Sequence, residues 1–239
     1  MSHNSWPEPA GERAETLTQF LNSLELYPAR LALFDQALTH SSYAYEHDLP
    51  GDNERLEFLG DSLIGFIVAE WLYRRSPNAS EGILSKQKGV VVSRMVLGHC
   101  AEELGLDGVL QLGRGDSRSS ARKRSSVLGS ALEALVGAAY LEMPFETVRD
   151  FVLRQIAIPS QEYIERAAVR DYKSALQELV QKRFHQTPVY RMVSAEGPDH
   201  EKQFCVEVLV NGQLQGRGAG KRRKSAENEA ALEALRNLA

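Results

Sequence analysis

The sequence has 239 residues, of which 43% are hydrophobic and 25% charged, enough for one large domain or two smaller ones with a buried core. The longest nearly apolar stretch runs from Leu63 to Tyr73 and is interrupted by Glu70. It falls short of the roughly 20 apolar residues of a membrane-spanning helix, so we expect no membrane segment. The net charge of −4 is unevenly distributed, because residues 171–239 carry 11 Lys and Arg against 9 Asp and Glu, whereas residues 1–170 carry 17 against 23.

The N-terminal region lacks the basic and then apolar pattern of a signal peptide, and the only cysteines are Cys100 and Cys205. We therefore expect a cytoplasmic protein with free thiols. Helical periodicity begins near Thr16, so residues 1–14 are expected to be a disordered tail.

The region from residue 15 to residue 160 shows helical periodicity and no convincing strand, which predicts an all-α domain. Turn-forming residues separate its helices. The expected helices cover Leu31–Thr39, a segment starting at Asn53, a segment starting near Ser80, and an apolar stretch ending near Leu141. A Gly/Ser/Arg-rich loop is expected over Leu112–Ser126.

The segment NERLEFLGDSLI, residues 53–64, places three acids on one face of a helix. Glu54, Glu57 and Asp61 fall within roughly 60° of each other, opposite a leucine-rich face. One interpretation is a solvated acidic face. The other follows from the apolar residues around the acids, since a covered acidic face requires a cation or a proton to offset its charge.

The segment VLGSALEALVGAAYL, residues 127–141, is a helix of mainly small and apolar residues in which Glu133 is the only side chain that carries a charge at neutral pH. A structural carboxylate paired with a buried arginine is one interpretation. If this helix instead packs against the acidic helix, Glu133 joins Glu57 and Asp61 in an oxygen-rich pocket. Such a pocket suits Mg²⁺, and the cysteines and histidines show no zinc spacing.

The pattern changes after a short charged connector, residues 161–170. Residues 171–239 show an amphipathic helix, three strand-like segments and a closing helix, with Asn211-Gly212 as a hairpin turn. The predicted fold is therefore an all-α domain followed by an α+β domain with the order α-β-β-β-α.

NERLEFLGDSLI closely resembles the signature motif of bacterial ribonuclease III, and the segments ALTHSSY, SEG and EALVGAAYL follow the same family. The resemblance implies a helical, dimeric, Mg²⁺-dependent endonuclease domain that cleaves both strands of double-stranded RNA and leaves 5′-phosphate and 3′-hydroxyl ends. It implies that Asp61 and Glu133 are catalytic, and that they hold Mg²⁺ together with Glu57. Mn²⁺ is a possible substitute.

The same resemblance gives roles to three further residues. Glu54 and Glu81 match acids that line the cleavage valley near the RNA or the partner subunit. Phe58 matches an aromatic residue that inserts into the other protomer, which would cover the acidic face.

One position departs from the family pattern, because Ser130 stands where the family usually has an Asp one turn before the catalytic Glu. Serine is neutral and a weaker metal ligand, so a direct bond to the metal can be replaced by a water that its hydroxyl holds. An enzyme that needs more Mg²⁺ is one consequence, and loss of catalysis is the other.

The expected loop also carries five cations, which serve either as solubilising charges or as phosphate contacts. These cations are Arg114, Arg118, Arg122, Lys123 and Arg124. His40, within the THSSY segment, is expected to be a structural residue rather than a general base.

The C-terminal region resembles a double-stranded RNA-binding domain over its full length. That resemblance places the RNA contacts at Gln177 and Glu178 on the first helix, at Pro198 and His200 in the loop EGPDH, and at Lys221, Arg223 and Lys224 at the start of the last helix. Such domains recognise A-form shape over about 16 base pairs with little base readout.

The sequence therefore predicts a homodimeric ribonuclease III-type endoribonuclease that processes ribosomal and other structured precursor RNAs. Its expected partner is double-stranded RNA, and we expect no association with a membrane. The alternative is a catalytically weak or inactive dimer that binds double-stranded RNA.

Overall fold

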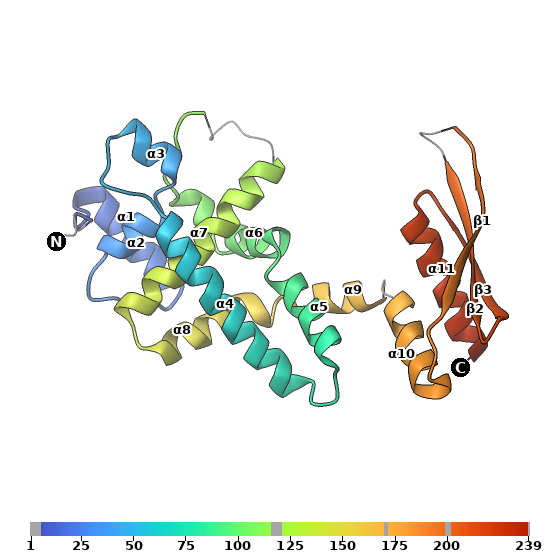
Figure 1. Ribbon diagram of the computed structural model, residues 1–239. Helices are drawn as coiled ribbons and strands as arrows, with labels where there is room; N and C mark the ends of the chain where they lie inside the picture. The colour runs from blue at the N-terminus through green and yellow to red at the C-terminus, as the bar shows by residue number, and fades with distance from the viewer. Residues whose placement is uncertain (1–5, 116–120, 170–171, 199–201, 239) are drawn as a thin grey trace. The chain divides into compact units, whose positions relative to one another are not determined.

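The computed structural model describes residues 6–115, 121–169, 172–198 and 202–238. The chain divides into two compact units, Met1–Ile164 and Glu165–Ala239 (Figure 1). Within these described ranges, no helix is long and apolar enough to cross a membrane.

The N-terminal unit is built from helices, as predicted (Figure 1). In chain order, these are α1 (Gly11–Ser23), α2 (Ala32–Ala37), α3 (Ser41–Glu46), α4 (Glu54–Arg75), α5 (Glu81–Val91), α6 (Arg94–Glu103), the short 3₁₀ helix η1 (Leu106–Gly108), α7 (Ala121–Glu142), α8 (Phe145–Val152) and the π-helical turn η2 (Leu153–Ala157). Helix α9 (Gln161–Val169) begins in this unit and extends past its end at Ile164.

The core of this unit forms around α4 and α7, which lie against each other. Leu56 and Ile67 of α4 are buried, whereas Leu59 and Leu63 are partly buried. Nearly every residue of α7 between Leu128 and Ala139 is buried, because small side chains allow other helices to pack on several sides. The apolar composition of this segment therefore reflects a central position.

The expected N-terminal tail is partly ordered. Trp6 is only 9% exposed, and its indole Nε1 donates a hydrogen bond to Asp35 Oδ2 at 3.0 Å. Helix α1 begins at Gly11, and Arg13 pairs with Asp35 at 2.7 Å. The prediction of disorder through residue 14 was wrong for this segment. Contacts with Asp35 of α2 hold it in place, and no local sequence pattern reveals these contacts.

The expected loop over Leu112–Ser126 is shorter than predicted, because α7 already begins at Ala121. Arg122 and Arg124 therefore belong to the first turn of a helix. Ala, Arg and Lys have high helix propensity. In addition, a Cβ at Gly98 of α6 would lie 2.3 Å from the carbonyl oxygen of Ser125, so α6 packs closely against this part of α7.

The expected connector, residues 161–170, is also helical through Val169. Ile164 of α9 is 8% exposed and joins the core of the N-terminal unit, and the ring of Tyr163 packs edge-on against His99. The boundary between the two units, after Ile164, falls within this predicted linker, and its first residues pack on the N-terminal unit through their apolar side chains.

The C-terminal unit has the predicted α-β-β-β-α order: α10 (Tyr172–Phe184), β1 (Val189–Glu196), β2 (Gln203–Val210), β3 (Gln213–Gly220) and α11 (Arg223–Leu238). The strands form an antiparallel sheet in the order β1-β2-β3. Asn211 and Gly212 join β2 and β3 with φ of 53° and 74°, the left-handed conformation that a two-residue hairpin turn requires.

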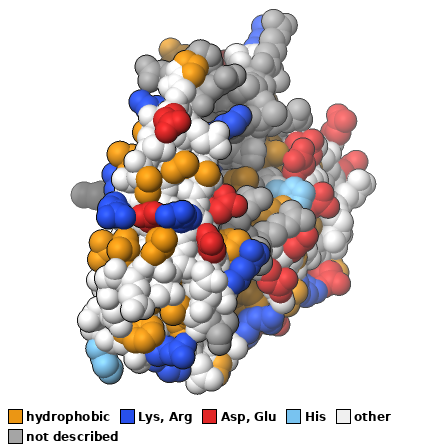
Figure 2. Space-filling model, turned by 90° about the vertical axis from the view of Figure 1, so that its right-hand side faces the viewer, with side chains coloured by type: hydrophobic (Ala, Val, Ile, Leu, Met, Phe, Trp, Pro, Cys, Tyr) orange, Lys and Arg blue, Asp and Glu red, His pale blue; other side chains and the backbone are white. Residues whose placement is uncertain are grey.

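Helix α11 packs directly on the sheet. A Cβ at Gly216 or Gly218 would lie 2.3 Å or 2.2 Å from a carbonyl oxygen of α11, so only glycine allows this approach. Alternate residues of β2, including Val208 and Val210, form the core of the unit with α10 and α11. On the surface that Figure 2 shows, apolar side chains are interspersed with side chains of both charges.

Candidate active site and RNA-binding surfaces

Helices α4 and α7 approach each other so closely that their backbones touch. A Cβ at Gly60 would lie 1.7 Å from the carbonyl oxygen of Glu133, and a Cβ at Gly137 would lie 2.3 Å from that of Leu56. The close approach that the small residues predicted is therefore confirmed. It places the turn containing Glu57 and Asp61 beside the turn containing Glu133.

Glu133 is electrostatically coupled to both acids of α4. Burial, followed by the negative charges of Asp61 and Glu57, raises the pKa of Glu133 to about 7, while the guanidinium of Arg94 opposes the shift. Among the described residues, no arginine forms an ion pair with Glu133. The interpretation of Glu133 as an arginine-paired structural carboxylate is therefore not supported.

Ser130 also faces α4. Its hydroxyl Oγ donates a hydrogen bond to Glu57 Oε1 at 2.9 Å. Ser130 lies one turn before Glu133 on α7, so the two helices are joined by a polar contact next to the point where their backbones touch. The structure thus brings together Glu57, Asp61, Ser130 and Glu133, the four residues for which the sequence suggested a metal-binding role.

These residues do not form a closed ligand cage, because the described part of the chain contains no group of three or more His, Cys, Asp or Glu side chains arranged to hold a metal ion. The donor set nevertheless fits a hard divalent cation. Three of its four members supply carboxylate oxygens, which Mg²⁺ and Mn²⁺ prefer, and the raised pKa of Glu133 marks a site where positive charge would be stabilised.

The acidic face of α4 is open in the single chain. Asp61 and Glu54 are exposed, and the neighbouring aromatic rings of Phe58 and Phe66 are 77% and 59% exposed. Large aromatic side chains that are exposed to this extent in a single chain are common at protein–protein interfaces. The cover that the sequence predicted for these acids does not come from the described residues of the same chain.

Glu81 and Arg94 are the first residues of the two helices that follow α4. Glu81 begins α5 and accepts a hydrogen bond from Ser85 Oγ at 2.6 Å, but it is not among the charges that shift the pKa of Glu133. Arg94, in the first turn of α6, is such a charge, and the sequence analysis missed it. No sequence signal distinguished Arg94, because its proximity to Glu133 depends on how α6 packs against α7.

Helix α3 binds the backbone at the start of the segment Leu112–Ser126, which carries the five cations. The amide of Gly113 donates to Ser42 Oγ at 3.0 Å, and the amide of Arg114 donates to Glu46 Oε1 at 3.0 Å. His40 caps α3 by accepting the amide of Ser42 on Nδ1, so the structure gives it the structural role that we expected. Arg118 and the side chains of Arg122, Lys123 and Arg124 lie outside the described residues.

The predicted RNA contacts of the C-terminal unit lie on its surface where they are described. Gln177 and Glu178 of α10 are exposed, as is Pro198, whereas His200 lies outside the described residues. Four exposed cations surround the start of α11, namely the predicted Lys221, Arg223 and Lys224, together with Arg222.

One of these cations is partly engaged within the chain. Arg223 Nε donates to Glu227 Oε1 at 2.9 Å, and Glu227 also accepts from Lys173 Nζ at 2.7 Å. Although burial acts to raise the pKa of Glu227, these hydrogen bonds hold it below its usual value. Glu227 therefore stays ionised and orients Arg223.

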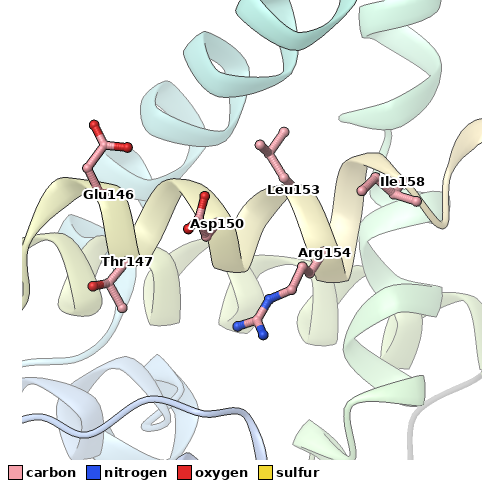
Figure 3. Close-up of a pocket in the computed structure, with 6 residues that line it drawn as sticks. All are labelled: Glu146, Thr147, Asp150, Leu153, Arg154 and Ile158. Carbon is pink, nitrogen blue, oxygen red and sulfur yellow. The ribbon is translucent and has the colours of Figure 1, made fainter.

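A separate pocket of about 510 Å³ lies along α8 and η2, lined by Glu146, Thr147, Asp150, Leu153, Arg154 and Ile158 (Figure 3). Its polar side chains do not converge, because Glu146 projects to one side of the helix and Arg154 to the other. Arg154 is bound to Glu25. This pocket therefore has no arrangement suited to catalysis.

Comparison with known proteins agrees with this geometry. Residues 31–159 match the family described as Ribonuclease-III-like, and residues 172–238 match the double-stranded RNA binding motif. The chain is 42% identical to Ribonuclease 3 of Moorella thermoacetica, over 94% of this chain and 96% of that protein. It is 40% identical to Ribonuclease 3 of Borreliella burgdorferi, over 95% and 94% of the two chains.

A solved structure supports the helical fold. The nuclease domain of ribonuclease III from Campylobacter jejuni, described as containing a region involved in dimer formation, matches with a TM-score of 0.54 and 31% identity over 59% of this chain and 95% of that one. With two touching helices that carry coupled acids, a C-terminal α-β-β-β-α unit, and relatives of this identity over nearly the full length, the chain belongs to the ribonuclease III family of endoribonucleases.

Proposed function

We propose that this endoribonuclease hydrolyses both strands of double-stranded RNA in a reaction that depends on Mg²⁺, with Asp61 and Glu133 as its catalytic residues. The observation that carries the proposal is the coupling of Glu133 to Asp61 and Glu57 where α4 and α7 touch. Three acids this close repel one another, and a divalent cation removes that repulsion.

Glu57, Asp61 and Glu133 would hold the cation. A divalent cation bound there supplies Lewis-acid stabilisation of the negative charge that develops on the phosphate oxygens. The carboxylates, which are anions like the phosphate, would fix the position of that cation and would accept hydrogen bonds from the attacking water. The exposed position of Asp61 leaves it accessible to an RNA backbone.

In the proposed reaction, a water oxygen forms a bond to phosphorus while the bond from phosphorus to the 3′-oxygen breaks in line with it. The proton that the water loses is balanced by one that the departing 3′-oxygen gains. The phosphate thus remains on the 5′ end of one product, and the other product ends in a 3′-hydroxyl.

The C-terminal unit would bind the duplex. Its Gln177, Glu178 and Pro198 are exposed, as contacts with a minor groove require. Lys221, Arg223 and Lys224 surround a helix start, where the amide groups add positive potential for phosphates. The proposal extends to His200 and, in the N-terminal unit, to Arg122 and Arg124, as further phosphate contacts.

The active form would be a homodimer, which places one site against each strand. The exposed Phe58 supports this arrangement, as does the dimer-forming region of the Campylobacter jejuni nuclease domain. Glu54 and Glu81 would line the valley between the two sites. We expect Phe58→Ala to shift the mass measured by analytical ultracentrifugation from dimer to monomer, whereas an unchanged mass would exclude Phe58 from the interface.

The decisive experiment incubates the protein with a long perfect RNA duplex and Mg²⁺ or Mn²⁺. The proposal requires short duplex products with 5′-phosphate ends. Glu133→Gln should abolish cleavage while the affinity for the duplex is unchanged. If this variant cleaves at the rate of the unmodified protein, Glu133 has no catalytic role.

Ser130 supports a second candidate function, a dimer that binds duplex RNA with weak or no cleavage, because a neutral side chain stands at a position where the family usually has a ligand. An intact duplex after incubation would favour this function. If the enzyme is active but needs more Mg²⁺, Ser130→Asp should lower the Mg²⁺ concentration at half-maximal rate, and an unchanged titration would refute that effect.

Within the cell, we propose that the enzyme acts in the cytoplasm on ribosomal and other structured precursor RNAs. Accumulation of uncleaved ribosomal precursors in cells that lack the protein would support this role.

A further inference from the structure

Ser130 uses its hydroxyl in an unusual way for a serine within a helix. Ser62 of α4 donates to the carbonyl oxygen of Phe58 at 3.2 Å and Ser23 of α1 to that of Phe20 at 2.6 Å, so each bonds to its own helix, four and three residues earlier. Ser130 instead donates across the helix interface to Glu57 Oε1. Since a hydroxyl has a single proton to donate, this bond uses the whole donor capacity of Ser130.

We propose that Ser130 is a positioning residue that orients the Glu57 carboxylate for a divalent cation. The inference rests on the proposed function, because it assumes that Glu57 is a ligand. Ser130 acts through Glu57 and need not bind the cation itself.

The surroundings of Glu57 explain why such a contact matters. Glu57 is half-buried and shares the interface between α4 and α7 with two other acids. Without a fixed partner, repulsion would turn its side chain away from Asp61 and Glu133. The hydrogen bond from Ser130 holds one oxygen of Glu57 against α7, on the side where Glu133 lies. The carboxylate is thereby oriented before a cation arrives, so less side-chain freedom is lost on binding.

The hydroxyl also differs from a carboxylate in what it can do here. An ionised aspartate at this position would have no proton to donate to Glu57 and would add a further negative charge to the interface. Serine therefore orders the three acids in the cation-free protein. In exchange, the site lacks a fourth carboxylate that could bind the cation directly.

The test measures Mn²⁺ affinity of the full-length protein by isothermal titration calorimetry, together with thermal melting in the presence of a chelator. Loss of a group that orients a metal ligand commonly lowers metal affinity by about 10–100-fold. We expect Ser130→Ala to weaken Mn²⁺ binding by about 10-fold or more, and Ser130→Thr, which keeps the hydroxyl, to restore most of the affinity. The melting temperature without metal should change little in either variant.

A matched control is available in α5, where Ser85 Oγ donates to Glu81 Oε1 at 2.6 Å. Ser85→Ala removes a bond of the same chemical kind from an acid that does not act on Glu133, so the Mn²⁺ affinity should not change.

A double-mutant cycle separates positioning from direct ligation. If Ser130 acts through Glu57, Ser130→Ala should have no further effect on Mn²⁺ affinity in a Glu57→Ala background. An additional loss in that background would mean that Ser130 contacts the cation directly or through water, and it would overturn the inference.

The inference and the proposed function fail in distinguishable ways. If Ser130→Ala binds Mn²⁺ as tightly as the unmodified protein, only the role of Ser130 is refuted. If the unmodified protein binds no Mn²⁺, or if Glu57→Ala and Glu133→Gln leave binding unchanged, the proposed metal site is refuted, and the inference fails with it.

Discussion

Replacement of Gly60 by alanine tests the contact on which the whole site depends. The new Cβ would lie 1.7 Å from the carbonyl oxygen of Glu133, although ordinary van der Waals contact begins at 3.4 Å. The obstacle is backbone, which cannot rotate away as a side chain can. Helices α4 and α7 must therefore separate, and Glu57 and Asp61 must move away from Glu133.

The expected cost follows from the size of this clash. Overpacking of a core costs about 1–3 kcal/mol, and contact with backbone places Gly60→Ala at the upper end. Since 1 kcal/mol lowers the melting temperature of a unit of this size by about 2–4 °C, the midpoint should fall by about 6–12 °C. A displacement of catalytic groups by about 1 Å costs on the order of 100-fold in rate, so duplex cleavage should fall at least that far.

The assay is calorimetric melting together with single-turnover cleavage of an RNA duplex. Gly89→Ala is the matched control, because Gly89 lies within α5 and a Cβ there meets no atom within 4 Å. That variant should gain about 0.5–1 kcal/mol from the better helix propensity of alanine and cleave normally. A Gly60→Ala protein that melts and cleaves like the unmodified protein would refute the close packing of α4 and α7.

Three further predictions concern regions outside this interface. The hydrogen bond from Arg191, opposed by burial and aided by Arg217, lowers the pKa of Glu207. The ionised Glu207 carboxylate therefore stabilises the folded protein at pH values above its pKa in the unfolded chain, and this stabilisation is lost as the pH falls through its lower pKa in the folded protein. The Glu207→Gln variant should have a lower melting temperature at neutral pH, and its melting temperature should fall less on acidification than that of the unmodified protein. Lys221→Ala should weaken duplex binding for all sequences and reduce the slope of log affinity against log salt by about 1, and an unchanged slope would exclude a phosphate contact. Trp6→Ala should cost up to about 3–5 kcal/mol in the free energy of unfolding if the indole packs as the structure shows, and an unaffected denaturant midpoint would contradict its burial.

Periodicity located the main elements well, but their ends depended on contacts that lie far apart in the sequence. Helix α7 extends back to Ala121 beyond its apolar stretch, since α6 packs against Ser125. Trp6 is ordered through Asp35, which lies 29 residues away. Such contacts leave no periodic signal, so the tail and the connector were both predicted with too little structure.

The sequence by itself determined the class of each unit and the helices on which the acids lie. The spacing of Glu57 and Asp61, the small residues around Glu133 and the Asn211-Gly212 turn are local patterns, and local patterns follow from the geometry of a helix or a hairpin. Only the tertiary structure decided that the pKa of Glu133 is about 7, that Arg94 opposes this shift and that Ser130 donates to Glu57. These properties depend on distances between separate helices and on exclusion of water, and both arise only when the chain packs.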